Sequence, residues 1–215
     1  MEQLLWLYLQ PHDLDNPVVC FDERPCFLIG DEIAARPMQK GEVRKEHYTY
    51  TKNGSCTLMA AIEPLTGQRV AQVHTRRTKK EHTQFCQALA AAYPNAKKIR
   101  LVQDNLSTHN LSAFYENLPP AEAFALAQRF DFYYTPKCGS WLNMIEIEFS
   151  AVARECLHRP IPTQEKLERE VLKCLQERAD KKILIHWQFS LEKARGKLNS
   201  HYERARQPRD LRQGT

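Results

Sequence analysis

The chain has 215 residues and a formal net charge of +5 at pH 7. Hydrophobic residues make up 42% of it and charged residues 27%, which is ordinary for a globular protein and excludes disordered and fibrous classes. No stretch approaches the roughly 20 apolar residues that span a bilayer, and the acidic start lacks the basic region of a signal peptide. We therefore expect a cytoplasmic protein without a membrane partner, and its basic charge favours an anionic partner.

The seven cysteines are scattered and form no Cys-x-x-Cys pair. An odd, unclustered set in an intracellular chain predicts free and largely buried thiols.

The first half of the chain has the pattern of antiparallel β structure. Residues 1–15 predict a short amphipathic lead-in, and residues 31–46 predict an exposed loop. Lys-Asn-Gly-Ser at 52–55 and Pro-Leu-Thr-Gly at 64–67 predict turns. The apolar or alternating runs that predict strands are 18–22 with a possible continuation at 25–29, a strand edge at 48–51, then 55–63 and 69–75.

The second half alternates helical and strand patterns. Thr78 and Glu81 form a capping-box pattern that predicts a helix running to about Tyr93. The elements expected after it are a strand at 99–103, a helix opening at 105–109, a helix at 121–129, a strand at 132–134, a helix carrying Glu146, a helix from Thr163 to about Ala179, and a helix-compatible tail from Leu191. This order predicts an α/β fold, a mixed sheet flanked by helices on both faces.

Three acidic residues occupy positions that suit a metal-dependent enzyme. Asp22 and Asp104 each end an apolar strand pattern, and Glu146 lies in the first turns of a helix that follows a Pro/Gly/Ser turn. Carboxylates on strand ends and a helix turn are the oxygen ligands that hold paired divalent cations for phosphoryl transfer. Each acid alone has an ordinary explanation, as a turn former, a helix cap or a solvated side chain.

The helical pattern around Glu146 leaves the third acid undecided. An apolar stripe of Ile145, Phe149, Val152 and Cys156 is flanked on opposite edges by Glu146 and Glu148. In the first strand, Glu23 must point to the other sheet face from Asp22, so the two cannot serve equally well.

Three ordered stretches carry a family resemblance: Cys-Phe-Asp22-Glu, Val-Gln-Asp104-Asn-Leu-Ser-Thr-His109 and Tyr-Thr-Pro-Lys-Cys-Gly-Ser-Trp-Leu-Asn143-Met-Ile-Glu146. From about residue 16 to 202 the chain resembles the catalytic domain of bacterial insertion-sequence transposases. These are mariner-related proteins with a DDE endonuclease site on a ribonuclease H-like fold. The resemblance implies a lead-in at 1–15, a catalytic domain at 16–160, and C-terminal helices with a basic tail at 161–215.

The resemblance also implies which residues act. Asp22, Asp104 and Glu146 match the catalytic acids and would hold two Mg²⁺ or Mn²⁺ ions. The residues expected to shape the site or contact DNA are Asn105, His109, Lys137, Ser140, Trp141 and Asn143; core packing is the alternative for Trp141. Many relatives are expected to carry His where Cys138 stands.

The implied function is metal-dependent cleavage of transposon ends in the nucleoid and strand transfer into target DNA. The alternatives are a hydrolysis-only nuclease of the same fold and a non-catalytic remnant that binds DNA or a partner. A dimer on DNA is expected. Because the chain has no room for the helix-turn-helix domains of full-length relatives, a separate DNA-reading protein is a further expected partner. Two basic runs are candidates for phosphate contacts: Arg76, Arg77, Lys79 and Lys80, and Lys97, Lys98 and Arg100. The alternative for both runs is solvated surface, which is favoured slightly for Lys97 and Lys98.

Overall fold

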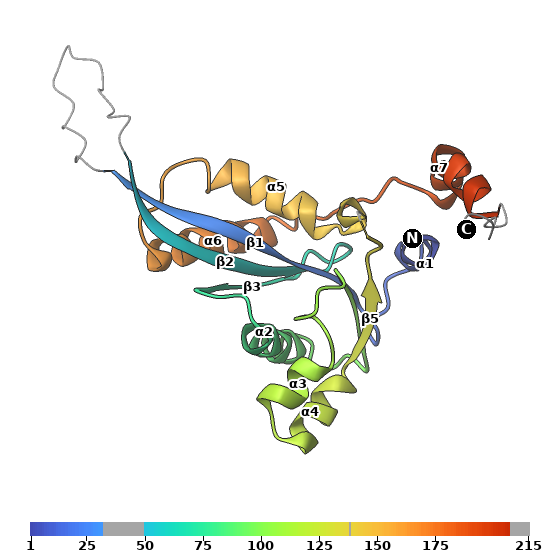
Figure 1. Ribbon diagram of the computed structural model, residues 1–215, viewed down its shortest axis with the longest axis horizontal. Coiled ribbons are helices and arrows are strands. Elements are labelled where there is room, and N and C mark those ends of the chain that lie inside the picture. The colour runs from blue at the N-terminus through green and yellow to red at the C-terminus, as the bar shows by residue number, and fades with distance from the viewer. Residues whose placement is uncertain (32–49, 138, 207–215) are drawn as a thin grey trace, which may run out of the picture.

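The computed structural model describes residues 1–31, 50–137 and 139–206. In this part of the chain, a five-stranded sheet has the order β3-β2-β1-β4-β5 (Figure 1). The strands are β1 (Val18–Asp31), β2 (Tyr50–Ile62), β3 (Arg69–His74), β4 (Ile99–Gln103) and β5 (Phe130–Tyr134). β1, β2 and β3 pair antiparallel, and β4 and β5 continue the sheet in parallel with β1. This confirms the predicted α/β fold with a mixed sheet.

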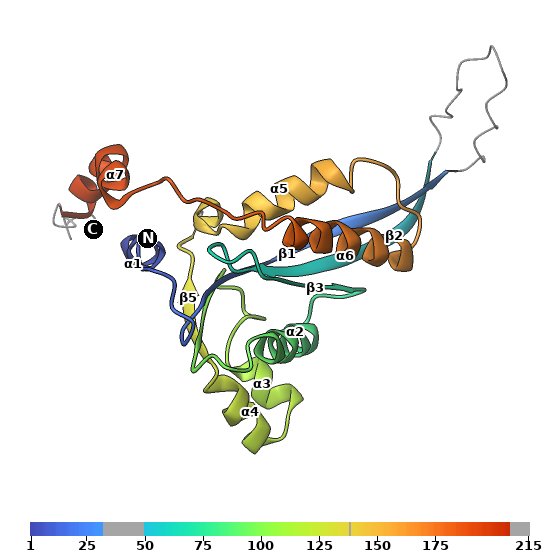
Figure 2. The ribbon, with the colours of Figure 1, turned by 180° about the vertical axis from the view of Figure 1, so that it is seen from behind.

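Helices cover both faces of the sheet, as Figures 1 and 2 show. They are α1 (Glu2–Tyr8), α2 (Lys79–Ala92), α3 (Ser112–Asn117), α4 (Pro120–Ala127), α5 (Ile145–Glu155), α6 (Gln164–Asp180) and α7 (Leu191–Arg206), with a short 3-10 turn η1 (Ser140–Leu142) before α5. One core cluster packs the sheet against α1, α5 and α6, and a second packs it against α2, α3 and α4. No helix in the described ranges is both long and apolar enough to cross a membrane.

Local sequence signals explain where the long helices begin. Thr78 and Glu81 form the predicted capping box at the start of α2, and the Thr163 side chain accepts a hydrogen bond from the Lys166 N–H at the start of α6. Each cap satisfies a backbone N–H that has no partner within its helix. The predicted apolar stripe of α5 is buried in the first core cluster.

The predicted turn at 52–55 is wrong, because β2 runs through it. Gly54 has φ +113°, a conformation that other residues rarely adopt, and the pairing with β1 shifts register between Leu28 and Ile29. The Asn-Gly pair therefore makes a β-bulge in a long strand instead of a hairpin turn. β1 is likewise one strand of 14 residues. Asp31, expected to open an exposed loop at 31–46, is instead the last residue of β1; the rest of that predicted loop lies in residues 32–49, outside the described residues.

The helix expected to open at 105–109 is also misplaced, since α3 begins only at Ser112. His109 is instead held by tertiary contacts: the Gln103 side-chain Nε2–H donates to the His109 carbonyl at 2.8 Å. The six cysteines that the structure describes are free and buried, as predicted: Cys20, Cys26, Cys56, Cys86, Cys156 and Cys174.

A buried carboxylate fastens α5 to two other elements. Glu148, 1% exposed, accepts paired hydrogen bonds from Arg69 of β3 at 2.7 and 3.2 Å and from Arg178 of α6 at 2.8 and 3.1 Å. Although burial alone would raise the pKa of Glu148, the bonds from the two guanidinium groups outweigh it and lower that pKa. Glu148 is therefore a structural anchor that fixes the helix carrying Glu146.

We predict that Glu148→Gln lowers the free energy of unfolding by about 3–5 kcal/mol, because it leaves two buried guanidinium groups undercompensated. Urea denaturation at pH 7 measures the effect. Glu146→Gln, on the exposed side of the same helical turn, is the matched control and changes stability by less than about 1 kcal/mol. Equal stability of the two variants would refute the anchoring role.

Candidate active site

The two aspartates are brought level by the pairing of β1 with β4. Val18 pairs with Arg100 and Cys20 with Val102 in parallel register. Continued by two residues, this register sets Asp22 level with Asp104, which directly follows β4. The strands pair over three residues only, so the two carboxylates lie just beyond the paired stretch. The predicted proximity of Asp22 and Asp104 follows from this register.

The electrostatics of Asp22 show that the third acid is also near. Burial raises the pKa of Asp22 from 3.8 to about 6, and the negative charges of Asp104 and Glu146 contribute to the rise. A hydrogen bond from the Glu23 N–H to Asp22 Oδ1 at 2.8 Å and the charge of His109 act in the opposite direction. Carboxylates from β1, the end of β4 and the first turn of α5 thus influence one another.

Asn143 connects the first acid to the helix that carries the third. Its buried side-chain Nδ2 donates to the Phe21 carbonyl at 2.8 Å and lies 3.5 Å from Asp22 Oδ2. Its own carbonyl accepts a hydrogen bond from the Glu146 N–H at 3.2 Å. One residue therefore ties the β1 backbone beside Asp22 to the start of α5.

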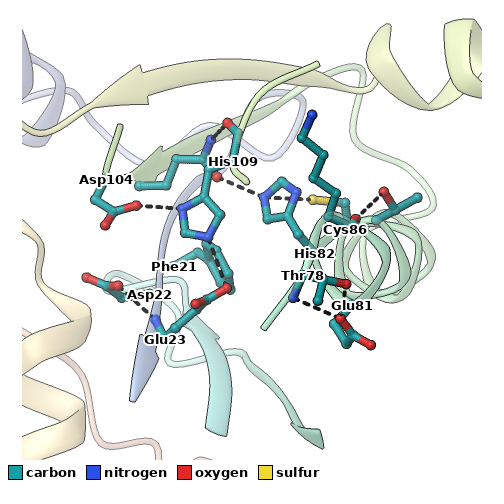
Figure 3. A network of polar contacts seen from close by, with 12 residues as sticks. Phe21, Asp22, Glu23, Thr78, Glu81, His82, Cys86, Asp104 and His109 are labelled. Atoms are coloured by element: carbon teal, nitrogen blue, oxygen red, sulfur yellow. Dashed lines mark hydrogen bonds and ion pairs between the residues drawn. The ribbon is translucent and has the colours of Figure 1, made fainter. Parts of the chain in front are cut away.

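His109 bridges two acids from different elements (Figure 3). Its Nδ1 lies 2.5 Å from Asp104 Oδ1, and its Nε2 lies 3.0 Å from Glu23 Oε1. The His109 ring is fully buried and the Glu23 side chain is 3% exposed. Burial alone would lower the pKa of His109, but the bonds to Asp104 and Glu23 and their charges raise it to about 9. A charged His109 donates to both carboxylates and fixes the orientation of Asp104.

Glu23 was missed as a contributor to the site. It does point away from Asp22, as the strand alternation predicted, but there it meets His109. Its partner lies 86 residues further along the chain, so no local pattern identifies the contact.

A second histidine packs against this bridge from α2. His82 stacks on His109 with ring centroids 4.7 Å apart, and its Nε2 contacts Gln103 Oε1 at 3.3 Å. Burial and the positive charge of His109 lower the pKa of His82 to about 4. His82 is therefore a neutral packing partner that supports the charged ring of His109 without repelling it.

The other predicted site residues lie at the surface. Asn105, Lys137, Ser140 and Trp141 are exposed. Trp141 is 49% exposed and meets Phe189 edge to face at 5.2 Å, so it is not a core residue. Cys138 lies outside the described residues.

The two basic runs differ in their surroundings. Lys97 pairs with Asp15, Lys98 with Asp131 at 2.9 Å, and Arg100 with Asp13 at 3.7 Å. These charges are already compensated within the protein, which favours the solvated-surface interpretation of this run.

In the run that opens α2, Lys79 pairs with Glu116 at 2.5 Å. Arg76, Arg77 and Lys80 are exposed and available to an anionic ligand.

The three acids of the site are side chains of the kind that bind divalent cations. Asp22, Asp104 and Glu146 offer hard carboxylate oxygens, and the raised pKa of Asp22 reflects partly the negative charge that a cation would offset. Within the described ranges, no three His, Cys, Asp or Glu side chains are grouped closely enough to hold a metal as they stand. Asp22 and Asp104 instead accept hydrogen bonds from Glu23 N–H and His109.

Comparison with known proteins gives a family. A family model described as DDE superfamily endonuclease matches residues 17–168. No curated protein matches the chain.

Among solved structures, the chain is similar to the Mos1 transposase paired-end complex with the left transposon end (15% identity, TM-score 0.41). It is also similar to the Mos1 strand transfer complex (14%, 0.42) and the mariner Mos1 paired-end complex with Mg (18%, 0.35). Each alignment covers 85% of this chain and 58% of the Mos1 chain. The chain thus spans little more than half the length of those proteins.

We predict that Asp22→Asn stabilises the protein at neutral pH. Between pH 3.8 and about 6 the folded protein keeps the Asp22 proton that the unfolded chain releases, so stability falls as pH rises through this range. The variant avoids this loss, gaining up to about 3 kcal/mol above pH 6, and the gain disappears below about pH 4.

Thermal unfolding in EDTA across pH 3.5–8 tests this, with Asp180→Asn at the exposed end of α6 as control. A variant that is no more stable than the parent at pH 7 would contradict the crowding of the acids.

Proposed function

The chain belongs to the DDE superfamily endonucleases, and we propose that it is the catalytic domain of a DNA transposase. It would cleave phosphodiester bonds at transposon ends and transfer the freed 3′ end into target DNA. The observation that carries this proposal is the β1–β4 register, which sets Asp22 level with Asp104, together with the Asn143 contacts that tie the start of α5, where Glu146 lies, to β1 beside Asp22.

In this proposal each acid provides oxygen ligands for divalent cations. Mg²⁺ or Mn²⁺ bound by Asp22, Asp104 and Glu146 would supply activation of the attacking hydroxyl and stabilisation of the leaving oxygen. Asp22 lies in β1 and Asp104 directly follows β4. Asn143 holds the start of α5, which carries Glu146, against β1. Ligands on rigid supports lose little free energy in ordering when the cations and the DNA bind.

His109 and Glu23 act as positioning residues in the same proposal. The His109 ring holds one oxygen of Asp104 and leaves the other available as a ligand. The buried Glu23 carboxylate anchors the opposite ring nitrogen. Such partners behind a metal ligand typically contribute 10–100-fold to metal affinity or activity.

We predict that Asp104→Asn and Glu146→Gln each reduce Mn²⁺-dependent nicking of a supercoiled plasmid by at least about 100-fold, because each removes a cation ligand. Asp180→Asn and Glu122→Gln are the matched controls, since both acids are exposed on helices away from the three acids. Glu148→Gln is assayed at a temperature where the variant remains folded. It is expected to keep its nicking activity, because the Glu148 carboxylate stabilises the fold and is not a cation ligand in this proposal.

Retained nicking in Asp104→Asn would overturn the proposed catalytic role. DNA substrates that carry transposon ends distinguish a transposase from a nuclease that only hydrolyses DNA. Strand-transfer products support a transposase, and hydrolysis products alone indicate a nuclease. DNA binding that is indifferent to Asp22 and to the cation, with no cleavage by the parent, indicates a non-catalytic protein.

A further inference from the structure

A groove lies beside the far half of β1, beyond the acidic site. It has a volume of about 370 Å³ and is lined by residues 24–27 and 29 of β1, by the 157–161 segment between α5 and α6, and by Leu167 of α6. The Ile29 N–H donates to the Ile161 carbonyl at 2.9 Å and so holds this segment along the edge of β1. On that edge β4 pairs only with Val18–Cys20, so within the described residues no strand covers the groove.

The polar groups of the groove are cationic or neutral. Arg24, His158 and Arg159 line it, and none of the described residues that line it is acidic. Arg159 is paired with Glu170 at 2.9 Å. Among the residues that the structure describes, none forms a hydrogen bond or an ion pair with the half-buried Arg24 guanidinium. A partly buried cation without a partner favours an anionic ligand that supplies oxygen acceptors.

An aromatic side chain stands next to these cations. Phe27 is 72% exposed and lines the same groove. Strand alternation directs it to the opposite sheet face from Arg24. A ligand lying along the strand edge therefore meets a cation on one side and an aromatic ring on the other. Phosphates and bases of one nucleic-acid strand offer these two chemistries, and aromatic platforms with cationic grooves are the common means of binding unpaired strands.

The strand edge itself is poorly suited to another β-strand. Pro25 lies in the middle of the open stretch and has no backbone N–H to donate. An extended peptide added to this edge would lose a main-chain hydrogen bond there. The chemistry of the groove therefore favours side-chain recognition of a charged polymer.

We propose that this groove binds an unpaired DNA strand, with a phosphate held by Arg24 and a base stacked on Phe27. The inference rests on the proposed function, since it extends the path of the DNA strand away from the acids. Arg24 follows Asp22 by two residues on the same face, about 7 Å along the strand, which equals the rise of about two stacked nucleotides. A strand whose phosphate lies at Asp22 thus reaches the groove without a break.

Fluorescence anisotropy with a labelled dT12 strand in EDTA, at several salt concentrations, tests the groove separately from cleavage. Phe27→Ala is expected to weaken binding about fivefold or more without changing the salt dependence, because it removes a stacked base. Arg24→Ala is expected to weaken binding and to reduce the slope of log K against log salt by about 0.7, the value for one phosphate contact on a single strand.

The matched controls are Phe124→Ala, an exposed phenylalanine on α4, and Lys181→Ala, an exposed cation at the far end of α6. On a strand of abasic sites, Phe27→Ala is expected to bind like the parent, whereas Arg24→Ala still binds more weakly. The proposal would be overturned if both groove variants bound dT12 like the parent, or if they lost no more affinity than the controls. It would also be overturned if the parent did not bind dT12. A parent that binds dT12 through the groove but cuts no DNA would leave the groove standing and refute only the cleavage activity.

Discussion

The short parallel pairing between β1 and β4 is the constraint on which the candidate site depends. Three paired residues set the register, and the paired stretch ends before the two carboxylates. Asp22 and Asp104 lie level with each other just beyond it, with no strand between them. A longer pairing would use the same backbone for hydrogen bonds within the sheet and would leave less room for a ligand between the two carboxylates.

Placing like charges together costs free energy, and the surrounding structure offsets part of that cost. The charged ring of His109 lies between Asp104 and Glu23, and the Glu23 N–H donates to Asp22. Asn143 fixes the approach of α5. The pKa of Asp22 nevertheless stays raised, so this part of the fold is less stable than it would be with a neutral residue there. Such local instability is typical of sites arranged for a ligand.

Much of this arrangement could be predicted from local sequence. The strand-end aspartates, the capping box of α2 and the apolar stripe of α5 are signals within a few residues, and the elements they predict are present. The choice between Glu146 and Glu148 could not be made from spacing, because the partners of Glu148 lie 79 and 30 residues away in sequence. The family resemblance favoured Glu146, and the ion pairs of Glu148 give an independent structural role to the other glutamate.

The errors have the same origin. The Asn-Gly pair at 53–54 has the local chemistry of a turn, but pairing with a long β1 carries the strand through it as a bulge. The turn before α3 has capping residues, but contacts of His109 with Gln103 and Asp104 delay the helix. The role of Glu23 depends on a histidine from another element. In each case a contact between residues distant in sequence outweighed the conformation or role that the neighbouring residues favour.

Asp22, Asp104 and Glu146 are proposed to form one cation site. Mn²⁺ titration followed by electron paramagnetic resonance, with the parent, Asp22→Asn, Glu146→Gln and the Glu122→Gln control, tests it most directly. If the three acids form one site, Asp22→Asn and Glu146→Gln both bind Mn²⁺ at least about tenfold more weakly than the parent and the control. Parent-like Mn²⁺ affinity in either variant would contradict it.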